Sequence, residues 1–440
     1  KENNGAIYGR RSDWQDLYSI AKKYYEALLA DPGNAQFHLT DPRGASDKSG
    51  RTFNNPYQYF FEQMHMDDAI YADESIYEYP MQQGGGNDGR PYSFGRPSSG
   101  GSKAAYPCKS YGQGRINPAY FYGVFDPNDM RRDVSITMTG SNGKGVEKLI
   151  PFVPNSKAEG GGLTLNKWDE NRQANPWVAA QRKSGINGPY MRMSEVYLGY
   201  AEVCAALGDV VTGKQYLKTV RERSFPQGLA NTDAFIASFG NDLVRAIIEE
   251  RGFEYAGEGD RRWTLIRSGY LPEDIKRIKD MTKAMMDGLA TKGYYEFENG
   301  NIISAYIWTK LVDAKTIYGH RLTAQCPTDK VNDPVLYPGW RGQKDNWEEM
   351  GLNYGSSTPA TNLAIKGLFE IVSEEEAASL ESQGYAKVNW GIDLVDYRDE
   401  YDKYLFWDYD YVSAPIYLWP FTPNVMAAGG FTNGYGFKQE

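Results

Sequence analysis

The sequence predicts a mainly α protein, in which helical hairpins carry long irregular loops and a few short strands. Apolar residues recur at helical spacings of three and four over Trp14–Leu29, over Arg192–Leu207 and again from Leu243 onward. Between residues 77 and 190, by contrast, glycine runs separate short aromatic pieces, and no helical period lasts more than a few residues. We therefore expect a single unit. Its predicted parts are helical residues 12–75, a loop-rich ligand region 76–190, a helical scaffold 191–290 and a loop-rich C-terminal part 291–440.

The first predicted helix, Trp14–Leu29, is amphipathic and ends at Asp31-Pro32-Gly33. The residues that share its apolar face are Leu17, Ile20, Ala21, Tyr24 and Leu28. We expect that face to pack against the rest of the protein. A second helix is predicted over Pro56–Met66.

The loop-rich region is expected to be ordered, with short strands at Val134–Met138 and Leu149–Val153. Tyrosine dominates the aromatic residues of the chain, with 34 Tyr against 18 Phe and 10 Trp. A tyrosine has an apolar ring face and a polar tip, which suits wet binding surfaces. The segment Gly140–Gly145 resembles a phosphate-binding loop only superficially, because no Ser or Thr follows Lys144, and a hairpin turn is expected there instead.

The helical scaffold begins at Arg192, with Val196, Tyr200 and Cys204 on one face. Gly208-Asp209 ends this helix, and a capping box formed by Thr212 and Gln215 is expected to open the next. Two helices joined by about four residues form an antiparallel hairpin of the tetratricopeptide kind. No clean repeat at that family's period of about 34 residues accompanies it.

The most informative segment follows, where the apolar stripe of Leu243, Ala246 and Ile247 continues into Glu250 and Glu254. A carboxylate on a buried stripe is costly unless it is paired and hydrogen-bonded. We expect the pairing to come from arginines close by in the sequence, namely Arg251, Arg261, Arg262 and Arg267. The predicted charge latch comprises Arg192, Glu195, Glu250, Arg251, Glu254, Glu258 and Arg261, and its role is structural.

The C-terminal part is predicted from four further stretches. A helix covers Pro272–Leu289, strand-like pieces lie in Gly293–Ile317, and a loop rich in Trp, Tyr, Gly and Pro covers Thr316–Asn362. A short acidic helix is expected over Ser373–Gln383, before the aromatic and acidic run Tyr397–Phe421.

Composition excludes several classes of function. The net charge is −9, with a pI near 5.2, which argues against a nucleic-acid footprint and against a basic patch for anionic lipid. No apolar run approaches the ~18–20 residues needed to span a bilayer. The three cysteines are far apart and unpatterned, so neither a disulfide scaffold nor a cysteine metal site is expected, and Cys204 is interpreted as a small core hydrophobe.

No enzyme is expected. The three histidines form no zinc motif, and no G-x-S-x-G nucleophile elbow is present. Glu250, Glu254 and Glu258 lie beside arginines that hold a carboxylate ionised, whereas a general acid needs a raised pKa. No cofactor is expected either. The acidic run Asp393–Asp410 lacks the order of a calcium-binding loop and is interpreted as a solvated face, with a structural calcium ion left open.

Three motifs together resemble the SusD/RagB family. Arg192–Glu202 is similar to the family's R-x-x-E-x-x-L-x-x-A-E helix, Glu250–Arg261 to its E-R-x-x-E … E-G-x-R signature, and Leu418–Tyr435 to its C-terminal P-x-P … N-P-G-Y closure. The chain departs from the pattern at Thr264, where the family has Asp. It departs again at Thr422, which replaces the second Pro, and between Asn433 and Gly434, where the Pro is missing.

The resemblance implies a surface lipoprotein of the Gram-negative outer membrane, which acts as lid and capture subunit for a SusC-like TonB-dependent barrel and does no catalysis. Most such relatives hold glycans, and those of the RagB branch hold peptides. A helical scaffold without a small ligand is a third alternative. The family's lipoprotein signal, acylated cysteine and first helices have no counterpart here, so we expect a missing N-terminal part that carries the lipid anchor.

Ligand-binding residues are expected among aromatics in Gly/Pro-rich loops rather than on helical stripes, since flat rings hold sugars and peptides in exposed clefts. Tyr197, Tyr200 and Tyr216 lie on packing faces and are assigned to the core. The predicted ligand-binding residues are Tyr92, Tyr106, Tyr111, Tyr122, Trp168, Trp177, Trp340 and Trp347, and Tyr120 and Tyr354 fit the same description.

Overall fold

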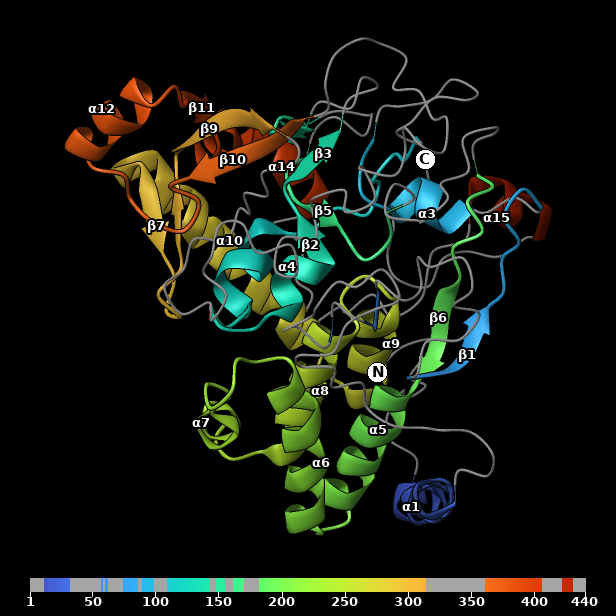
Figure 1. Cartoon of the computed structure of the whole chain (residues 1–440). Coiled ribbons are helices and arrows are strands. Elements are labelled where there is room, and N and C mark those ends of the chain that lie inside the picture. The colour runs from blue at the N-terminus through green and yellow to red at the C-terminus, as the bar shows by residue number, and fades with distance from the viewer. Residues whose placement is uncertain are drawn as a thin grey trace.

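The computed structural model describes residues 12–31, 57, 60–61, 74–85, 89–98, 109–141, 147–154, 161–169, 182–313, 361–405 and 422–429. Helices dominate these residues, and the strands are short and antiparallel, as predicted for a mainly α fold. Figure 1 shows the helices of residues 193–237 at one end of the molecule, and the largest sheet, with further helices beside it, at the other. Among the helices of the described part, none is both long enough and apolar enough to cross a membrane.

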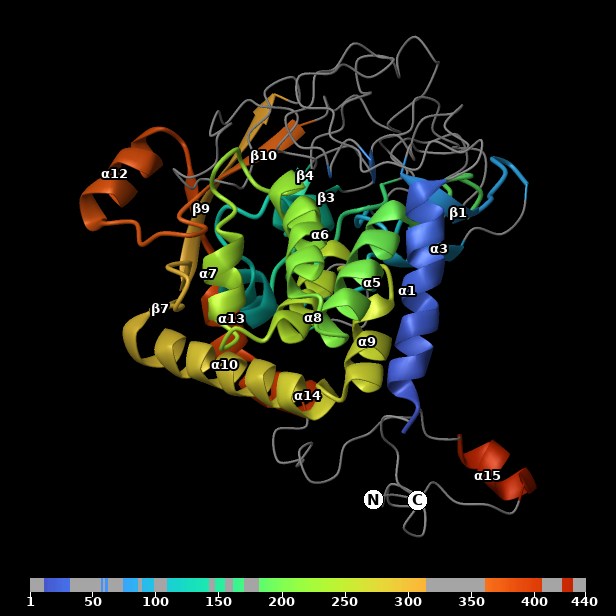
Figure 2. The same ribbon diagram turned by 90° about the horizontal axis from the view of Figure 1, so that it is seen from below.

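The scaffold is a set of packed helices (Figure 2). Helix α5 (Met193–Ala206) lies between α1 (Trp14–Ala30) and α6 (Val210–Arg223), and it also contacts α8 (Leu243–Glu254). The predicted antiparallel hairpin is therefore the pair α5 and α6. The other helices of the scaffold are α7 (Thr232–Ala237), α9 (Asp260–Ser268) and α10 (Leu271–Lys292).

The start of α6 differs from the predicted capping box. The carboxylate of Asp209 accepts a hydrogen bond from the backbone N–H of Thr212 at 3.3 Å, so Asp209 is the N-cap and Thr212 lies within the first turn. Asp at this position satisfies one of the N–H groups that a helix start leaves unpaired. Tyr200 and Tyr216 pack edge to face at 4.7 Å in the hairpin, which confirms their assignment to the core. Cys204 is buried beside them.

Helix α1 forms where predicted but presents a different face to the protein. Leu17, Ile20 and Tyr24 are exposed, whereas Tyr18 and Tyr25 pack against α5. The expectation for this face is confirmed for Ala21, which packs against α5, but it was wrong for Leu17, Ile20 and Tyr24. The ring of Tyr18 gains both packing and a hydrogen bond on the inner face, because its hydroxyl donates to Glu202 Oε1 at 3.1 Å.

Within the described residues, the strands form five small antiparallel sheets. In the largest, β9 (Tyr306–Asp313) pairs with β10 (Thr361–Lys366) on one side and β11 (Ala386–Asn389) on the other. The two-stranded pairs are β1 (Ser75–Tyr79) with β6 (Gly188–Arg192), β2 (Ile136–Thr137) with β5 (Thr164–Leu165), β3 (Thr139–Ser141) with β4 (Glu147–Leu149), and β7 (Tyr294–Glu296) with β8 (Ile302–Ser304).

The predicted strands at 134–138 and 149–153 are only partly correct. Val134 belongs to a helical turn, α4 (Arg131–Ser135), and the chain becomes extended only from Ile136. Strand β4 ends at Leu149, so the second prediction overlaps it by one residue. The pairing of β3 with β4 fits the hairpin expected around residues 140–145, although residues 142–146 lie outside the described part.

The remaining helical segments are α3 (Gly89–Phe94), a π-helical turn at Tyr120–Val124, α12 (Glu374–Ser382), α13 (Gly391–Asp396), α14 (Arg398–Leu405) and α15 (Pro423–Gly429). The predicted acidic helix is α12, capped by Ser373. Of the helix predicted at 56–66, only Tyr57, Phe60 and Phe61 lie within the described residues, and all three are buried. The loop expected at 316–362 lies outside them except for the start of β10.

Candidate functional site

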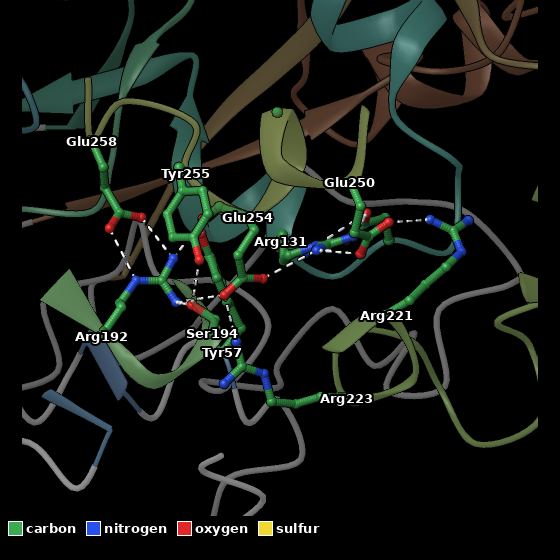
Figure 3. A network of polar contacts seen from close by, with 12 residues as sticks. Tyr57, Arg131, Arg192, Ser194, Arg221, Arg223, Glu250, Glu254, Tyr255 and Glu258 are labelled. Carbon is green, nitrogen blue, oxygen red and sulfur yellow. Dashed lines mark hydrogen bonds and ion pairs between the residues drawn. The ribbon is translucent and has the colours of Figure 1, made fainter. Parts of the chain in front are cut away.

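Charged side chains form a buried network around Glu250 and Glu254, the carboxylates predicted on the apolar stripe of α8 (Figure 3). Glu254 is 0 % exposed. Its Oε1 atom accepts from Arg192 Nη1 and from Arg223 Nη2, each at 2.5 Å, and its Oε2 accepts from Arg131 Nη1 at 3.1 Å. The carboxylate is therefore surrounded by three guanidinium groups.

Glu250, one turn earlier on α8, is equally buried. It pairs with Arg131 Nη1 at 2.7 Å and accepts from Arg221 Nη1 at 2.9 Å. Arg131 also pairs with Asp129 at 2.7 Å, so one arginine joins both glutamates of the stripe (Figure 3). The prediction that acidic side chains lie on a buried helical face and are neutralised by arginines is confirmed.

The expected partners were wrong. Three of the arginines chosen for their closeness in sequence pair with other carboxylates: Arg251 with Glu195 at 2.7 Å, Arg261 with Glu249 at 2.8 Å, and Arg267 with Glu202 at 2.5 Å. Arg262 is half-buried on α9. Residues next to each other along a helix point to different sides of it, so these nearby arginines do not face Glu250 and Glu254. The arginines that do pair with the two glutamates come from segments that are distant in the sequence.

Arg192 connects this network to the ribbon formed by β1 and β6. It is the last residue of β6, and its Nη1 donates to Glu74 at 2.9 Å, just before β1 begins. Its Nη2 and Nε donate to the two carboxylate oxygens of Glu258, at 2.9 Å and 3.0 Å. Lys167 pairs with the same Glu258 at 2.6 Å. One end of the ribbon is thereby tied to the helical scaffold.

The electrostatics of the network are those of a structural element. Burial by itself raises the pKa of the Glu254 carboxyl, but Arg223, Arg192 and Arg131 outweigh it and hold that pKa well below its usual range. Burial also raises the pKa of the Glu249 carboxyl, but the positive charges of Arg261 and Arg277 outweigh burial and lower that pKa to about 2. A general acid requires the opposite shift. These carboxylates therefore stay ionised and serve the fold.

The outer face of the ribbon carries a platform of three tyrosines, Tyr77, Tyr79 and Tyr190, which we call the tyrosine platform. These residues are 54 %, 46 % and 64 % exposed. Tyr190 packs edge to face against Tyr77 at 5.6 Å and against Tyr79 at 5.4 Å, between ring centroids. Since side chains alternate along a strand, Tyr77 and Tyr79 share a face, and Tyr190 lies across from them on β6.

The ribbon is braced at its other end by Asn187. The amide of Asn187 donates to Glu78 Oε2 at 2.9 Å and accepts from the backbone N–H of Met81 at 2.8 Å. Glu78 is buried beneath the platform. A two-stranded ribbon is at best marginally stable alone, so these contacts and those of Arg192 are what hold the tyrosine platform in place.

Short helix α3 lies next to the platform and presents Arg90 to it. The guanidinium carbon of Arg90 lies 5.3 Å from the centroid of the Tyr79 ring. Beyond it, Arg182 lies 4.4 Å over the ring of Tyr92, which packs at 5.0 Å against Tyr111. The structure thus brings together Tyr92 and Tyr111, two of the residues predicted to bind ligand, although Tyr92 is buried and Tyr111 half-buried.

Two other predicted ligand residues are core residues, and their assignment is corrected. Tyr122 is 0 % exposed, and its hydroxyl accepts from Trp390 Nε1 at 2.8 Å. Trp168 is 1 % exposed and packs near Leu165. Aromatic side chains in glycine-rich segments can pack into the core, so a position in a loop does not by itself make a side chain exposed. Tyr106, Trp177, Trp340 and Trp347, and also Tyr354, lie outside the described residues.

The sequence reasoning missed the tyrosine platform. Its signal was present as the alternation Tyr77-Glu78-Tyr79, which is typical of a strand with one exposed face.

The expectation of a solvated acidic face was wrong for Asp393, which is buried, and burial raises the pKa of its carboxyl. Within the part of the chain that the structure describes, no three His, Cys, Asp or Glu side chains gather as they would around a metal ion.

Taken together, the structure combines a scaffold of helical hairpins, a ribbon that displays exposed aromatic rings and a set of carboxylates kept ionised by arginine. Residues 36–420 match the model of the SusD family. The chain therefore belongs to the SusD family.

Individual relatives are more distant. The SusD-like protein P25 of Formosa agariphila is 28 % identical over 160 residues, which cover 36 % of this chain and 26 % of that protein. A SusD homologue from Bacteroides thetaiotaomicron has a TM-score of 0.44 at 18 % identity, over 63 % of this chain and 53 % of that one. The surface glycan-binding protein A of the same organism, solved with laminarihexaose, has a TM-score of 0.41 at 20 % identity, over 59 % and 52 % of the two chains.

Proposed function

We propose that this chain captures glycan at the bacterial surface and that the tyrosine platform is part of its binding face. The observation that carries the proposal is the cluster of Tyr77, Tyr79 and Tyr190, three large rings in mutual contact that are about half exposed. Clustered exposed aromatics are uncommon on a protein surface unless they meet a partner.

The chemistry of a tyrosine fits a carbohydrate. Its ring offers a flat apolar face to the C–H groups of a sugar, and its hydroxyl can donate to or accept from sugar hydroxyls. The three rings already pack against one another and belong to a braced ribbon, so little conformational freedom is lost when a ligand binds. Tyr111, half-buried beside Tyr92, extends the proposed face, and the predictions for Tyr106, Trp177, Trp340 and Trp347 are kept.

The proposed cellular role follows the family. We place the chain at the outer membrane of a Gram-negative bacterium, as a lipoprotein lid and capture subunit for a SusC-like TonB-dependent importer. Membership of the SusD family supports this assignment. Co-purification of a barrel of that class with the tagged protein from its host membrane is the expected result, and its absence would contradict the partnership.

Calorimetry tests the binding function. The wild-type protein is titrated with a panel of polysaccharides and peptides, and Tyr79→Ala is compared with Tyr24→Ala. Tyr24 is also an exposed tyrosine, 71 % accessible, but it lies on α1. We expect a glycan to bind, Tyr79→Ala to weaken it by about tenfold or more, and Tyr24→Ala to leave it unchanged. Binding of peptides alone would favour the RagB-like alternative. If neither glycans nor peptides bind, the result would favour a scaffold without a small ligand.

A further inference from the structure

We propose that Arg115 is an anion-binding position of the same binding face and that it takes a carboxylate or a sulfate ester of the captured glycan. This inference rests on the proposed function and specifies its ligand. A guanidinium matches either group, because it can direct two parallel N–H donors at two of the oxygens.

Arg115 is a half-buried cation without a counter-ion from the protein. No Asp or Glu of the described residues forms an ion pair with it, and its buried Nη1 atom has no hydrogen-bond partner. Arginine is rarely buried unless it is paired, because an uncompensated charge is costly to remove from water. A ligand that carries negative charge would supply the missing partner.

Two arginines of the interior show what a protein counter-ion does. Burial acts to lower the pKa of Arg131 and of Arg192, but neighbouring carboxylates outweigh burial and raise both pKa values well above the ordinary range. For Arg115 burial prevails and lowers the pKa, since the opposing effect of Tyr401 is smaller. Arg115 therefore bears a desolvation cost that no described carboxylate offsets.

The backbone holds Arg115 in place. Arg115 forms an antiparallel bridge with Thr164 of β5. The N–H of the next residue, Ile116, donates to the carbonyl oxygen of Leu163 at 3.1 Å. On the other side, the carbonyl oxygen of Gly114 accepts from the hydroxyl of Thr164 at 3.0 Å. Because these bonds already fix the segment, little ordering is needed when a ligand binds.

Glycine at position 161 makes room for the side chain. A Cβ atom on Gly161 would lie 3.2 Å from Arg115 Nε, which is closer than most side-chain carbons approach. One side of the guanidinium group therefore lies against bare backbone. Since Arg115 is only half-buried, the rest of the side chain stays accessible to a ligand.

Arg115 continues the proposed binding face beyond Tyr111. The four residues of chain that separate the two positions span at most about 14 Å. Gln113, between them, is exposed, and its amide can both donate to and accept from sugar hydroxyls. The N–H of Gln113 donates to the carbonyl oxygen of Ser93 at 2.6 Å, which ties this segment to α3 beside the tyrosine platform. One glycan chain can therefore contact the ring, the amide and the guanidinium.

The test uses matched polymers and the whole chain. Calorimetry and affinity electrophoresis compare polygalacturonate with neutral galactan, and dextran sulfate with dextran, so that the two pairs separate a carboxylate from a sulfate. Poly-glutamate is the acidic peptide. The variants are Arg115→Gln, Arg115→Lys and Tyr79→Ala, and Lys283→Gln, an exposed cation on α10, is the control for the loss of one charge. The thermal midpoint of each ligand-free variant is measured as well.

We expect at least one acidic polysaccharide to bind about tenfold or more tightly than its neutral counterpart, and Arg115→Gln to remove most of that preference. Arg115→Lys keeps the charge but not the paired donors, so it should retain only part of the preference. Lys283→Gln should leave it unchanged. Because Arg115→Gln also removes a desolvated charge, the thermal midpoint of the free protein should stay the same or rise.

The inference is overturned if neither acidic polysaccharide binds more tightly than its neutral partner, or if the preference survives Arg115→Gln. A lower thermal midpoint for Arg115→Gln would also overturn it, since the guanidinium would then serve the fold. A neutral glycan whose binding needs Tyr79 but not Arg115 would overturn this inference and leave the proposed function standing. Glycan binding that is indifferent to Tyr79→Ala would instead contradict the proposed binding face, and binding of poly-glutamate without any polysaccharide would contradict both.

Discussion

Arg192 and Glu254 meet at two points: Arg192 Nη1 lies 2.5 Å from Glu254 Oε1, and its Nη2 donates to the Glu254 backbone carbonyl oxygen at 2.7 Å. One residue ends the ribbon that displays the tyrosines, and the other ends helix α8 of the scaffold. This contact therefore connects the ribbon of β1 and β6, which we propose to bind ligand, to helix α8 of the scaffold.

Removal of the Glu254 carboxylate should therefore be severely destabilising. Glu254→Leu leaves Arg131, Arg192 and Arg223 buried without their shared counter-ion, and loss of one partner of a buried ion pair typically costs about 3–5 kcal/mol. The free energy of unfolding, from urea denaturation, measures the loss. The matched control is Glu375→Leu on the exposed face of α12, which should change stability by no more than about 0.5 kcal/mol. Equal stability of the two variants would refute the buried-pair interpretation.

Acid should unfold the protein through the same carboxylates. Folding lowers the pKa of Glu249 from 4.5 to about 2 and lowers that of Glu254 further. In this range the unfolded chain takes up protons that the folded protein does not, so stability is full above about pH 5 and falls as the pH drops toward 2. Thermal unfolding between pH 7 and pH 3 should show a steadily decreasing midpoint. A midpoint that stays constant to pH 3 would show that these groups are not held ionised by folding.

Asn187→Ala should loosen the ribbon without unfolding the scaffold. The variant removes a donor to Glu78 and an acceptor for the Met81 N–H, and each buried polar group left with fewer partners costs about 1–3 kcal/mol. Hydrogen exchange should speed up in β1 and β6 but not in α5 or α8, and glycan affinity should fall. Gln82→Ala, an exposed neighbour, is the control. Unchanged exchange in the ribbon would contradict the bracing role of Asn187.

Gly162→Ala should destabilise the core around Phe152 and Trp390. Gly162 has φ +70, and a Cβ there would lie 2.1 Å from the Phe152 ring, so the variant adds overpacking to backbone strain. Gly300→Ala, at φ +83 with nothing within 4 Å, carries the backbone strain alone. The thermal midpoint should fall more for Gly162→Ala, and equal shifts would mean that the core accommodates the added methyl group.

Much of this protein was predictable from local pattern. The 3.6-residue period located α1, α5, α8 and α10 within a few residues, because a helix records its buried face in a short stretch of sequence. The acidic residues on the apolar stripe of α8 also predicted a buried network of charged side chains. Which face α1 turns inward was not predictable in the same way, since the choice depended on Tyr18 reaching Glu202, a residue on another helix.

By itself, the sequence determined that a mainly α scaffold would bury paired carboxylates and carry aromatic, loop-rich segments. Only the tertiary structure decided the partners and the exposed rings. Arg131 and Arg192 are 123 and 62 residues from Glu254 along the chain, and Tyr190 meets Tyr77 only because β1 and β6 pair across the whole loop-rich region. Periodicity specifies which side of an element is buried. What it is buried against depends on contacts between residues far apart in the chain, and these form only when the chain is folded.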